Sequence, residues 1–387
     1  MEKIIYVDNN ATTKVAPEVF QAMRPFLTDN YGNPSSMHNF GGSIVKYIED
    51  ARKKVAGLIG AADSSEIIFT SCGTESDNTA INSTLRSYPD KKHIITTKVE
   101  HPAVLNLCKY LETVGYRITY LDVGPDGLLD INELKNAVDH DTVLISIMHA
   151  NNETGVIFPV AEIAEIARVR DITFHTDAVQ TVGKIPIKMT ELPVDFLSLS
   201  GHKLHGPKGV GALYVRKGTR FSPFMVGGHQ ENGRRAGTEN VASIVGLGVA
   251  AELAKNNIKE EITKVKKLRD KLENYILENV SNTKVNGDSK KRLPNTSNIG
   301  FEFVEGEAIL LKLDEKNIAA SSGSACTSGS LTSSHVLKSM GIPVTFIQGS
   351  VRFSLSRYNA DKEIDYINKN IPAIIGKLRE ISPFGKK

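Results

Sequence analysis

The sequence lacks the features of a membrane-spanning or exported protein. No apolar run approaches the roughly 20 residues that cross a bilayer. The first residues, MEKIIYVDNNATT, have neither the basic start nor the long apolar middle of a signal peptide. Hydrophobic residues make up 40% of the chain and charged residues 24%, which is typical of a soluble globular protein. We therefore expect a cytoplasmic protein with no membrane partner.

Cysteine and net charge are also scarce. The three cysteines, Cys72, Cys108 and Cys326, are too few and too widely separated for a disulfide framework or a CxxC-type metal site. Lysine and arginine total 47 against 44 acidic residues, a net charge of +3, so the composition does not indicate a nucleic-acid partner. No GxxxxGKS or GxxxxGKT motif is present, which argues against a nucleotide-binding P-loop.

The length of 387 residues and the alternation of helical and β-rich patterns predict an α/β protein of two domains. Several β-rich runs are almost entirely apolar, as expected for strands covered on both faces of a mainly parallel sheet. We expect a large domain over residues 15–257, and a smaller α+β domain formed by residues 1–14 and 258–387. The predicted strands are residues 66–71, 93–97, 117–123, 142–150, 172–178, 194–200 and 211–216.

A lysine and an aspartate lie where α/β sheets hold their ligands. Lys203 directly follows the apolar run VDFLSLS, and Asp177 lies near the end of the run ITFHTDA. Taken alone, Lys203 also fits a surface lysine in a hairpin, and Asp177 fits a helix cap or a salt bridge. Together they match the needs of pyridoxal phosphate, which are a lysine for the Schiff base and an acid that keeps the pyridine nitrogen protonated.

A glycine turn before a helix adds to this pattern. In FTSCGTESDN a strand leads through Gly73 into a helix that opens near Thr74. The free N–H groups and the positive dipole end of a helix start can bind a phosphate. The spacing of Thr74 and Asp77 also fits a simple capping box.

Eleven segments in order along the chain carry a resemblance to a known family. They are YVDNNATT, YGNPSSMH, FTSCGTESDN, EHPAV, HANNETG, FHTDAVQ, SGHKLHGPKGVG, GGHQENGRRAGTEN, RLPNTSNI, SSGSACTSGS and VRFSLSRY. Over essentially its whole length the chain resembles the NifS-like cysteine desulfurases of the class V aminotransferase family. The resemblance implies a fold-type I pyridoxal phosphate-dependent transferase that converts L-cysteine to L-alanine.

The resemblance also implies a set of cofactor-binding residues. Lys203 would form the Schiff base, Asp177 would pair with the pyridine nitrogen, and Gln180 would hydrogen-bond the phenolic oxygen of pyridoxal 5'-phosphate. Thr238 would reach the phosphate from a second subunit, which implies an obligate homodimer. The remaining implied cofactor contacts are Gly73, Thr74, Asn152, Ser200 and His202.

Further residues are implied to act on the substrate. His101 would lie over the cofactor ring and move substrate protons. Arg352 would bind the substrate carboxylate, a task that suits its planar, two-pronged donor, and Asn152 would assist beside the substrate. Arg357 lies in the same segment as Arg352 and matches no implied role.

Cys326 lies in the small, polar stretch SSGSACTSGS. Its serine and glycine neighbours would leave a thiol accessible and free to move, as a nucleophile requires, although the residues alone also fit an incidental loop cysteine. The resemblance implies that Cys326 attacks the substrate sulfur and carries it as a persulfide. Of the other two cysteines, Cys108 is expected to pack in a helix and Cys72 to line the phosphate turn.

The function implied is sulfur supply for iron–sulfur cluster assembly, with an iron–sulfur scaffold protein as the acceptor. A nitrogenase-specific acceptor, general cluster assembly and thiolation of transfer RNA all remain open. The alternatives are a selenocysteine lyase, another class V aminotransferase, which needs no such thiol, and a non-catalytic scaffold.

Overall fold

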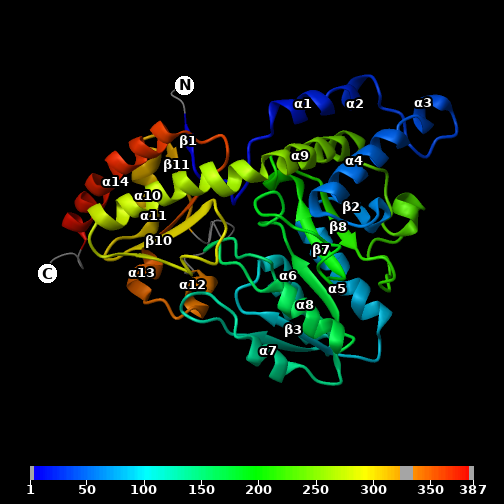
Figure 1. The fold of residues 1–387 in the computed structure, drawn as a ribbon, viewed down its shortest axis with the longest axis horizontal. Helices are drawn as coiled ribbons and strands as arrows, with labels where there is room; N and C mark the ends of the chain where they lie inside the picture. The colour runs from blue at the N-terminus through cyan, green and yellow to red at the C-terminus, as the bar shows by residue number, and fades with distance from the viewer. Residues whose placement is uncertain (1–3, 323–333, 383–387) are drawn as a thin grey trace.

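The computed structural model describes residues 4–322 and 334–382. A seven-stranded sheet forms the larger part of the fold (Figure 1), and each of its strands falls within one of the predicted β-rich runs. β8 runs in the opposite direction to the other six strands of this sheet, which is therefore mainly parallel, as predicted. In spatial order the strands are β2 (Ile67–Thr70), β8 (Gly211–Val215), β7 (Phe196–Ser200), β6 (Thr173–Asp177), β5 (Thr142–Ser146), β3 (His93–Thr97) and β4 (Arg117–Leu121).

Helices cover both faces of this sheet, which explains why its strands are almost entirely apolar. Ile67 and Phe69 of β2 join a core with helices α4, α8 and α9, whereas Ile68 between them faces the opposite side with Ala80 of α5. The helices of this part are α1 (Pro17–Met23), α2 (Pro25–Thr28), α3 (Asn39–Gly42), α4 (Val45–Ile59), α5 (Gly73–Ser87), α6 (Pro102–Thr113), α7 (Ile131–Ala137), α8 (Val160–Val169) and α9 (Val241–Glu260).

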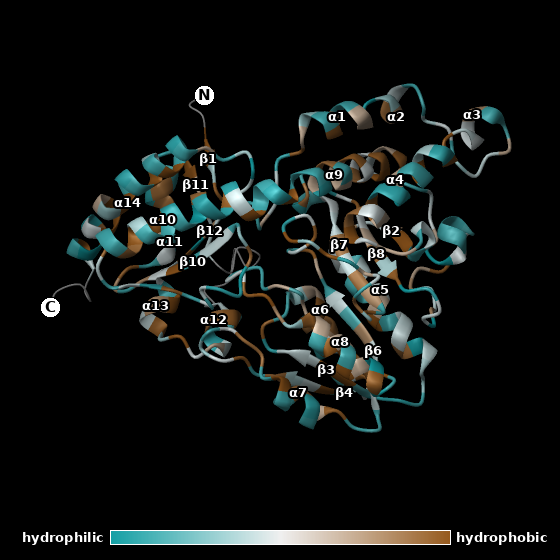
Figure 2. Ribbon diagram, viewed as in Figure 1, coloured by the Kyte–Doolittle hydropathy of each residue, from teal (hydrophilic) through white to brown (hydrophobic). Residues whose placement is uncertain are grey.

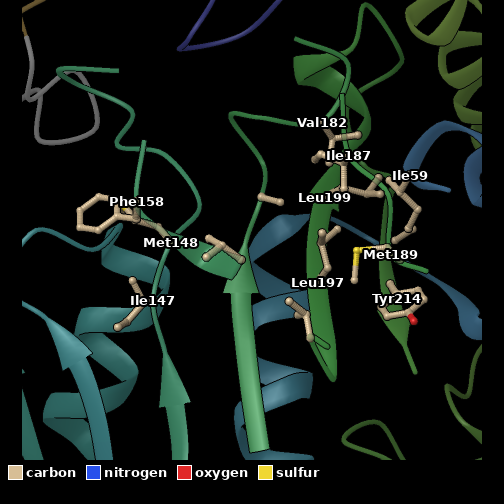
Figure 3. Packing of buried hydrophobic residues seen from close by; sticks show 14 of the residues in the cluster. Ile59, Ile147, Met148, Phe158, Val182, Ile187, Met189, Leu197, Leu199 and Tyr214 are labelled. Carbon is tan, nitrogen blue, oxygen red and sulfur yellow. The ribbon is translucent and has the colours of Figure 1, made fainter. Parts of the chain in front are cut away.

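The core that contains Ile67 and Phe69 extends to the middle of the sheet. Leu197 and Leu199 project from β7 beside Met189 and Tyr214 (Figure 3), and all four side chains are buried. The same core also receives side chains from residues 336–347, far along the chain. Burial on this scale fixes β7 in place, and the lysine that follows it is thereby held at the edge of the sheet.

The second part of the fold has its own core, which combines Val7 with residues 265–378. It contains an antiparallel sheet of β12 (Ser350–Ser354), β10 (Thr296–Phe301) and β9 (Thr283–Val285), and a parallel pair of β1 (Ile5–Tyr6) and β11 (Ile318–Ala319). The first and the last described residues both lie on this side of the molecule (Figure 1). Its helices are α10 (Lys266–Asn279), α11 (Gly306–Asp314), α12 (His335–Ser339), α13 (Val344–Gln348) and α14 (Asp361–Ile381).

One long helical path connects the two parts. Helix α9 passes through a π-helical turn at Glu261–Val265 directly into α10. Residues 258–279 therefore form the second half of one longer helical path. The visible sides of α10 and α14 are largely hydrophilic (Figure 2), in keeping with the charged pattern of the sequence. Within the described residues, we find no helix with both the length and the apolar character needed to cross a membrane.

Candidate active site

A cavity lies where the carboxyl ends of β6 and β7 meet the amino ends of α5 and α6. The lining combines these four elements with the loop after β5 and with the N-terminal segment. Nine of the residues singled out in the sequence share this cavity: Gly73, Thr74, His101, Asn152, Asp177, Gln180, Ser200, His202 and Lys203. Cys72 also lines it, as expected, whereas Cys108 is fully buried in the core.

Lys203 lies at the end of a single 3-10 turn, Gly201–Lys203, that follows β7. Its Nζ donates a hydrogen bond of 2.8 Å to the carbonyl oxygen of Ala11 and a second one to the carbonyl oxygen of Asn10. These acceptors come from the N-terminal segment, which the sequence identified only as part of a matching motif. The two carbonyl oxygens hold the amine at the cavity wall.

Asp177 is the last residue of β6 and is 8% exposed. Its Oδ1 accepts a hydrogen bond of 2.9 Å from the backbone N–H of Val179, which orients the carboxylate. Burial, assisted by the nearby charge of Asp77, raises the pKa of Asp177 to about 6. Asp77 also lines the cavity, a position that sequence reasoning did not predict for it.

The amino end of α5, where the sequence predicts a phosphate site, lies at the cavity. The helix begins at Gly73 with Cys72 as its N-cap, and no side chain caps it. The capping box of Thr74 and Asp77 is wrong, because Thr74 already lies inside the helix and Asp77 points into the cavity. A Cβ at Gly73 would approach Val179 Cγ2 to 2.8 Å, so any larger residue here would force the Val179 side chain to move.

Among the buried polar atoms that lack a hydrogen-bond partner within the described part of the chain, Ser200 Oγ and Gln180 Oε1 belong to the cavity lining. Since buried polar groups are nearly always paired, both atoms indicate a polar ligand. The Nδ1 atom of His202 lies 3.1 Å from Thr12 Oγ1. Burial and the charge of Lys203 lower the pKa of His202 to about 4, so its imidazole is neutral at neutral pH.

His101 forms the N-cap of α6, and its Nδ1 accepts a hydrogen bond of 3.2 Å from the N–H of Ala103. In the neutral ring the proton therefore belongs to Nε2. Burial lowers the pKa of His101. A neutral imidazole fixed by its backbone contact can donate the Nε2 proton to a substrate and take it back.

Arg352, in the middle of β12, is 2% exposed and lies next to the cavity. Its Nη1 donates to the backbone carbonyl of Asn152 (3.0 Å) and its Nη2 to Asp8 Oδ1 (2.7 Å). Asp8 is a second residue that sequence reasoning missed. The Asp-Asn pair in YVDNNATT was its only signal.

Two residues singled out in the sequence, Thr238 and Arg357, do not line this cavity. Thr238 is exposed and lines a neighbouring cavity with Ser71 and Gly209, so it does not join the cofactor cavity of its own chain. Arg357 stacks over the Tyr358 ring, 4.9 Å from its centre, and lines a narrow cavity behind Lys203 with Lys184 and Glu261.

Cys326 lies outside the described residues, which resume at Ser334. The residues that flank this gap contact the active site. The backbone N–H of Arg352 donates to Ser321 O over 2.6 Å, and Ser334 Oγ donates to the buried Glu153 carboxylate over 2.5 Å. The imidazole Nε2 of His335 lies 3.0 Å from the carbonyl oxygen of Glu100, the residue before His101.

The cavity fits pyridoxal phosphate. It combines an amine, a carboxylate, a neutral histidine, the amino end of a helix and unpartnered hydroxyl and amide oxygens. Lys203 would hold the aldehyde carbon, Asp177 the pyridine nitrogen, and the amino end of α5 with Ser200 and His202 the phosphate. When bound, this cofactor supplies an electron sink for the carbon that bears the substrate's amino group.

Comparison with known proteins identifies the family of this chain. The model of the aminotransferase class-V family matches residues 5–367. A cysteine desulfurase of Trichormus azollae is 58% identical over 98% of this chain and 95% of its own length. The cysteine desulfurase NifS of Azotobacter vinelandii is 56% identical over 98% and 94%, respectively. The solved structure of a NifS-like protein superimposes with a TM-score of 0.91 at 40% identity, over 97% of this chain and 100% of that one.

Proposed function

Because this chain belongs to the class-V aminotransferase family and is a pyridoxal phosphate-dependent cysteine desulfurase, we propose that Lys203, His101 and Cys326 perform its reaction. The observation that carries the proposal is the shared cavity of Lys203, Asp177 and His101, with unpartnered oxygens of Ser200 and Gln180 in the same wall.

Each residue has one task. Arg352 binds the carboxylate of L-cysteine and places its α-carbon beside Lys203. The Lys203 amine takes the α-proton, a role for which its position at the cavity wall suits it. Asp177, once ionised, would hold the pyridine nitrogen of the bound cofactor in its protonated form. The neutral His101 moves the proton of the substrate thiol.

Sulfur transfer completes the cycle. The Cys326 thiolate attacks the substrate sulfur, the bond between sulfur and the β-carbon breaks, and a sulfur–sulfur bond forms. L-Cysteine and the Cys326 thiol thus become L-alanine and a persulfide on Cys326, with all atoms conserved. The attachment of Ser321 to Arg352 and of Ser334 to Glu153 supports this role, because it fixes the residues on both sides of the segment next to the cavity.

The persulfide then passes its outer sulfur to an acceptor, for which we propose an iron–sulfur scaffold protein in the cytoplasm. We also propose that the enzyme is a homodimer in which Thr238 completes the partner's phosphate site. Thr238 is exposed in a single chain, and so are Tyr31 (72%), Met37 (104%) and Val226 (86%), three apolar side chains that a second copy would cover.

The test is to add L-cysteine and a thiol reductant to the purified holoenzyme and to quantify alanine and sulfide. We expect both products in equal yield. A cofactor absorption band without sulfide would instead indicate an aminotransferase. Activity on selenocysteine but not on cysteine would indicate a selenocysteine lyase, and a colourless protein that cannot be loaded with cofactor would indicate a non-catalytic scaffold.

A further inference from the structure

Arg352 is a buried cation whose charge requires a partner. An isolated guanidinium is strongly unfavourable inside a protein, so a 2% exposed arginine is stable only with a counter-charge and hydrogen bonds. Asp8 supplies the counter-charge, and the ion pair spans 2.7 Å from Nη2 to Oδ1. The partner is therefore a residue 344 positions earlier in the chain.

The backbone holds Asp8 in place for this contact. The chain around Asp8 runs parallel to β12, with the N–H of Ser354 donating to Val7 O (2.7 Å) and the N–H of Asn9 donating to Ser354 O (3.0 Å). The hydroxyl of Tyr6 also donates to the carbonyl oxygen of Asp8 over 3.1 Å. Asp8 is thus held by its bridge to Ser354, which lies two residues after Arg352 in the same strand.

Two hydrogen bonds fix the plane of the guanidinium. Nη2 is held by Asp8 and Nη1 by the carbonyl oxygen of Asn152, so rotation about the last bonds of the side chain would break both contacts. Arginine has five N–H donors, and these contacts use two of them. Arg352 Nε has no partner within the described residues, and each terminal nitrogen keeps a second hydrogen. The remaining donors are available for a carboxylate.

A competing acidic group explains why orientation matters. Glu153, which is 3% exposed, is a second buried carboxyl. Burial raises the pKa of Glu153, and the positive charge of Arg352 opposes this effect. Without Asp8, the guanidinium would lose the partner that holds Nη2. The contact with Asp8 keeps it beside Asn152, which lines the cavity with Lys203 and His101.

We propose that Asp8 is a positioning residue that holds Arg352 in the orientation that binds the substrate's α-carboxylate, and that it thereby sets the preference for substrates with a free carboxylate. This inference rests on the proposed role of Arg352 as the carboxylate-binding residue. Asp8 itself does not touch the substrate.

The experiment compares Asp8→Ala with Asp8→Asn in the holoenzyme. The alanine variant removes the acceptor oxygen, so KM for L-cysteine should rise about 10- to 100-fold, as expected for the loss of a charged hydrogen bond, with kcat changed less than about threefold. The asparagine variant keeps an acceptor and should restore KM to within about threefold. The affinity for L-alanine, measured by the change in cofactor absorption, should likewise fall most in Asp8→Ala and least in Asp8→Asn.

Cysteamine, which lacks the carboxylate, separates positioning from a general structural role. In Asp8→Ala the ratio of kcat/KM for L-cysteine to that for cysteamine should fall at least tenfold. Equal losses for both substrates, or an unchanged KM for L-cysteine, would overturn the inference. If Asp8→Ala does not fold, Asp8→Ser tests the same point, because its shorter side chain does not reach Nη2.

Arg352→Gln distinguishes failure of this inference from failure of the proposed function. If Arg352→Gln lowers the L-cysteine to cysteamine ratio and Asp8→Ala does not, Arg352 binds the carboxylate and Asp8 does not position it. If Arg352→Gln leaves the ratio unchanged, the carboxylate site lies elsewhere and both assignments fail.

Discussion

Asp77 Oδ1 lies 3.4 Å from His175 Nε2, and both side chains are inaccessible to solvent. Burial lowers the pKa of His175 to about 4 and raises that of Asp77 to about 7. At neutral pH the imidazole is therefore uncharged and does not neutralise Asp77. The charge of Asp77 in turn raises the pKa of Asp177, so acidic groups beneath the cofactor cavity bind protons close to physiological pH.

This relationship predicts how pH controls cofactor binding. Asp177 has a pKa of about 6 in the free protein and must be ionised to stabilise a protonated pyridine nitrogen. The affinity of the apoprotein for pyridoxal phosphate should therefore fall as the pH is lowered from 7 to 5. The Asp177→Asn apoprotein should bind pyridoxal phosphate about 10- to 100-fold more weakly at pH 7. Its affinity should also lack the decrease between pH 7 and 5 that is due to protonation of Asp177. Fluorescence titration measures both, and an identical pH profile in the variant would contradict the assignment.

Protein stability should also depend on a buried acid. Burial raises the pKa of Glu100 from 4.5 to about 8, so the folded protein keeps a proton that the unfolded chain loses above pH 4.5. The free energy of unfolding should consequently decrease as the pH rises towards 8, by up to about 1.4 kcal/mol per pH unit for this group.

Urea denaturation of the apoprotein between pH 6.5 and 8 measures this effect, because the buried histidines with lowered pKa values affect stability only at lower pH. The glutamine of Glu100→Gln does not titrate, so this variant should show a flatter profile, with the remaining slope due to the other buried acids whose pKa values burial raises. A slope equal to that of the wild type would show that Glu100 is ionised in the fold.

The buried ion pair of Arg52 and Glu231 should be essential for stability. Two hydrogen bonds of 2.6 and 2.9 Å join the guanidinium to the carboxylate, and Arg52 Nη1 also donates to the carbonyl oxygen of Ile67. Arg52→Ala would leave Glu231 buried without its counter-charge, so we expect a loss of about 3–5 kcal/mol in the free energy of unfolding.

The matched control is Arg168→Ala, which breaks the solvent-exposed pair with Glu165 and should lower the free energy of unfolding far less than Arg52→Ala does. Urea denaturation of both variants provides the comparison. Equal, small losses would show that the Arg52–Glu231 pair contributes no more than a surface contact.

Lys203 is predicted to hold the cofactor covalently. Lys203→Ala should bind pyridoxal phosphate without forming an adduct that borohydride can fix to the protein, and mass spectrometry of the reduced protein checks this. Lys208→Ala, which alters an exposed lysine in the same loop, should form the adduct normally. A fixed adduct on the Lys203 variant would remove Lys203 from this role.

Much of the architecture could be predicted from the sequence because its signals are local. Runs such as EIIFTS and VDFLSLS are apolar on both faces, and the strands Ile67–Thr70 and Phe196–Ser200 lie within them. Lys203 and Asp177 were identified by their position at strand ends, and the fold brings them to one cavity.

Residues that depend on distant contacts could not be predicted in this way. Asp8 pairs with Arg352 across nearly the whole chain, and the carbonyl oxygens of Asn10 and Ala11 that receive Lys203 have no side-chain signature. Asp77 looked like part of a helix cap because its spacing from Thr74 fits that motif, whereas the helix begins one residue before Thr74 and turns Asp77 inwards.

The most direct test of sulfur transfer is the reaction of Cys326→Ser with L-cysteine. The variant holoenzyme should bind L-cysteine and change its cofactor absorption, because Lys203 and His101 are intact, yet it should release neither alanine nor sulfide in the presence of a thiol reductant. Cys72→Ser, the control for a thiol that lines the cavity, should retain turnover. Equal yields of alanine and sulfide from Cys326→Ser at the wild-type rate would contradict the proposed role of Cys326.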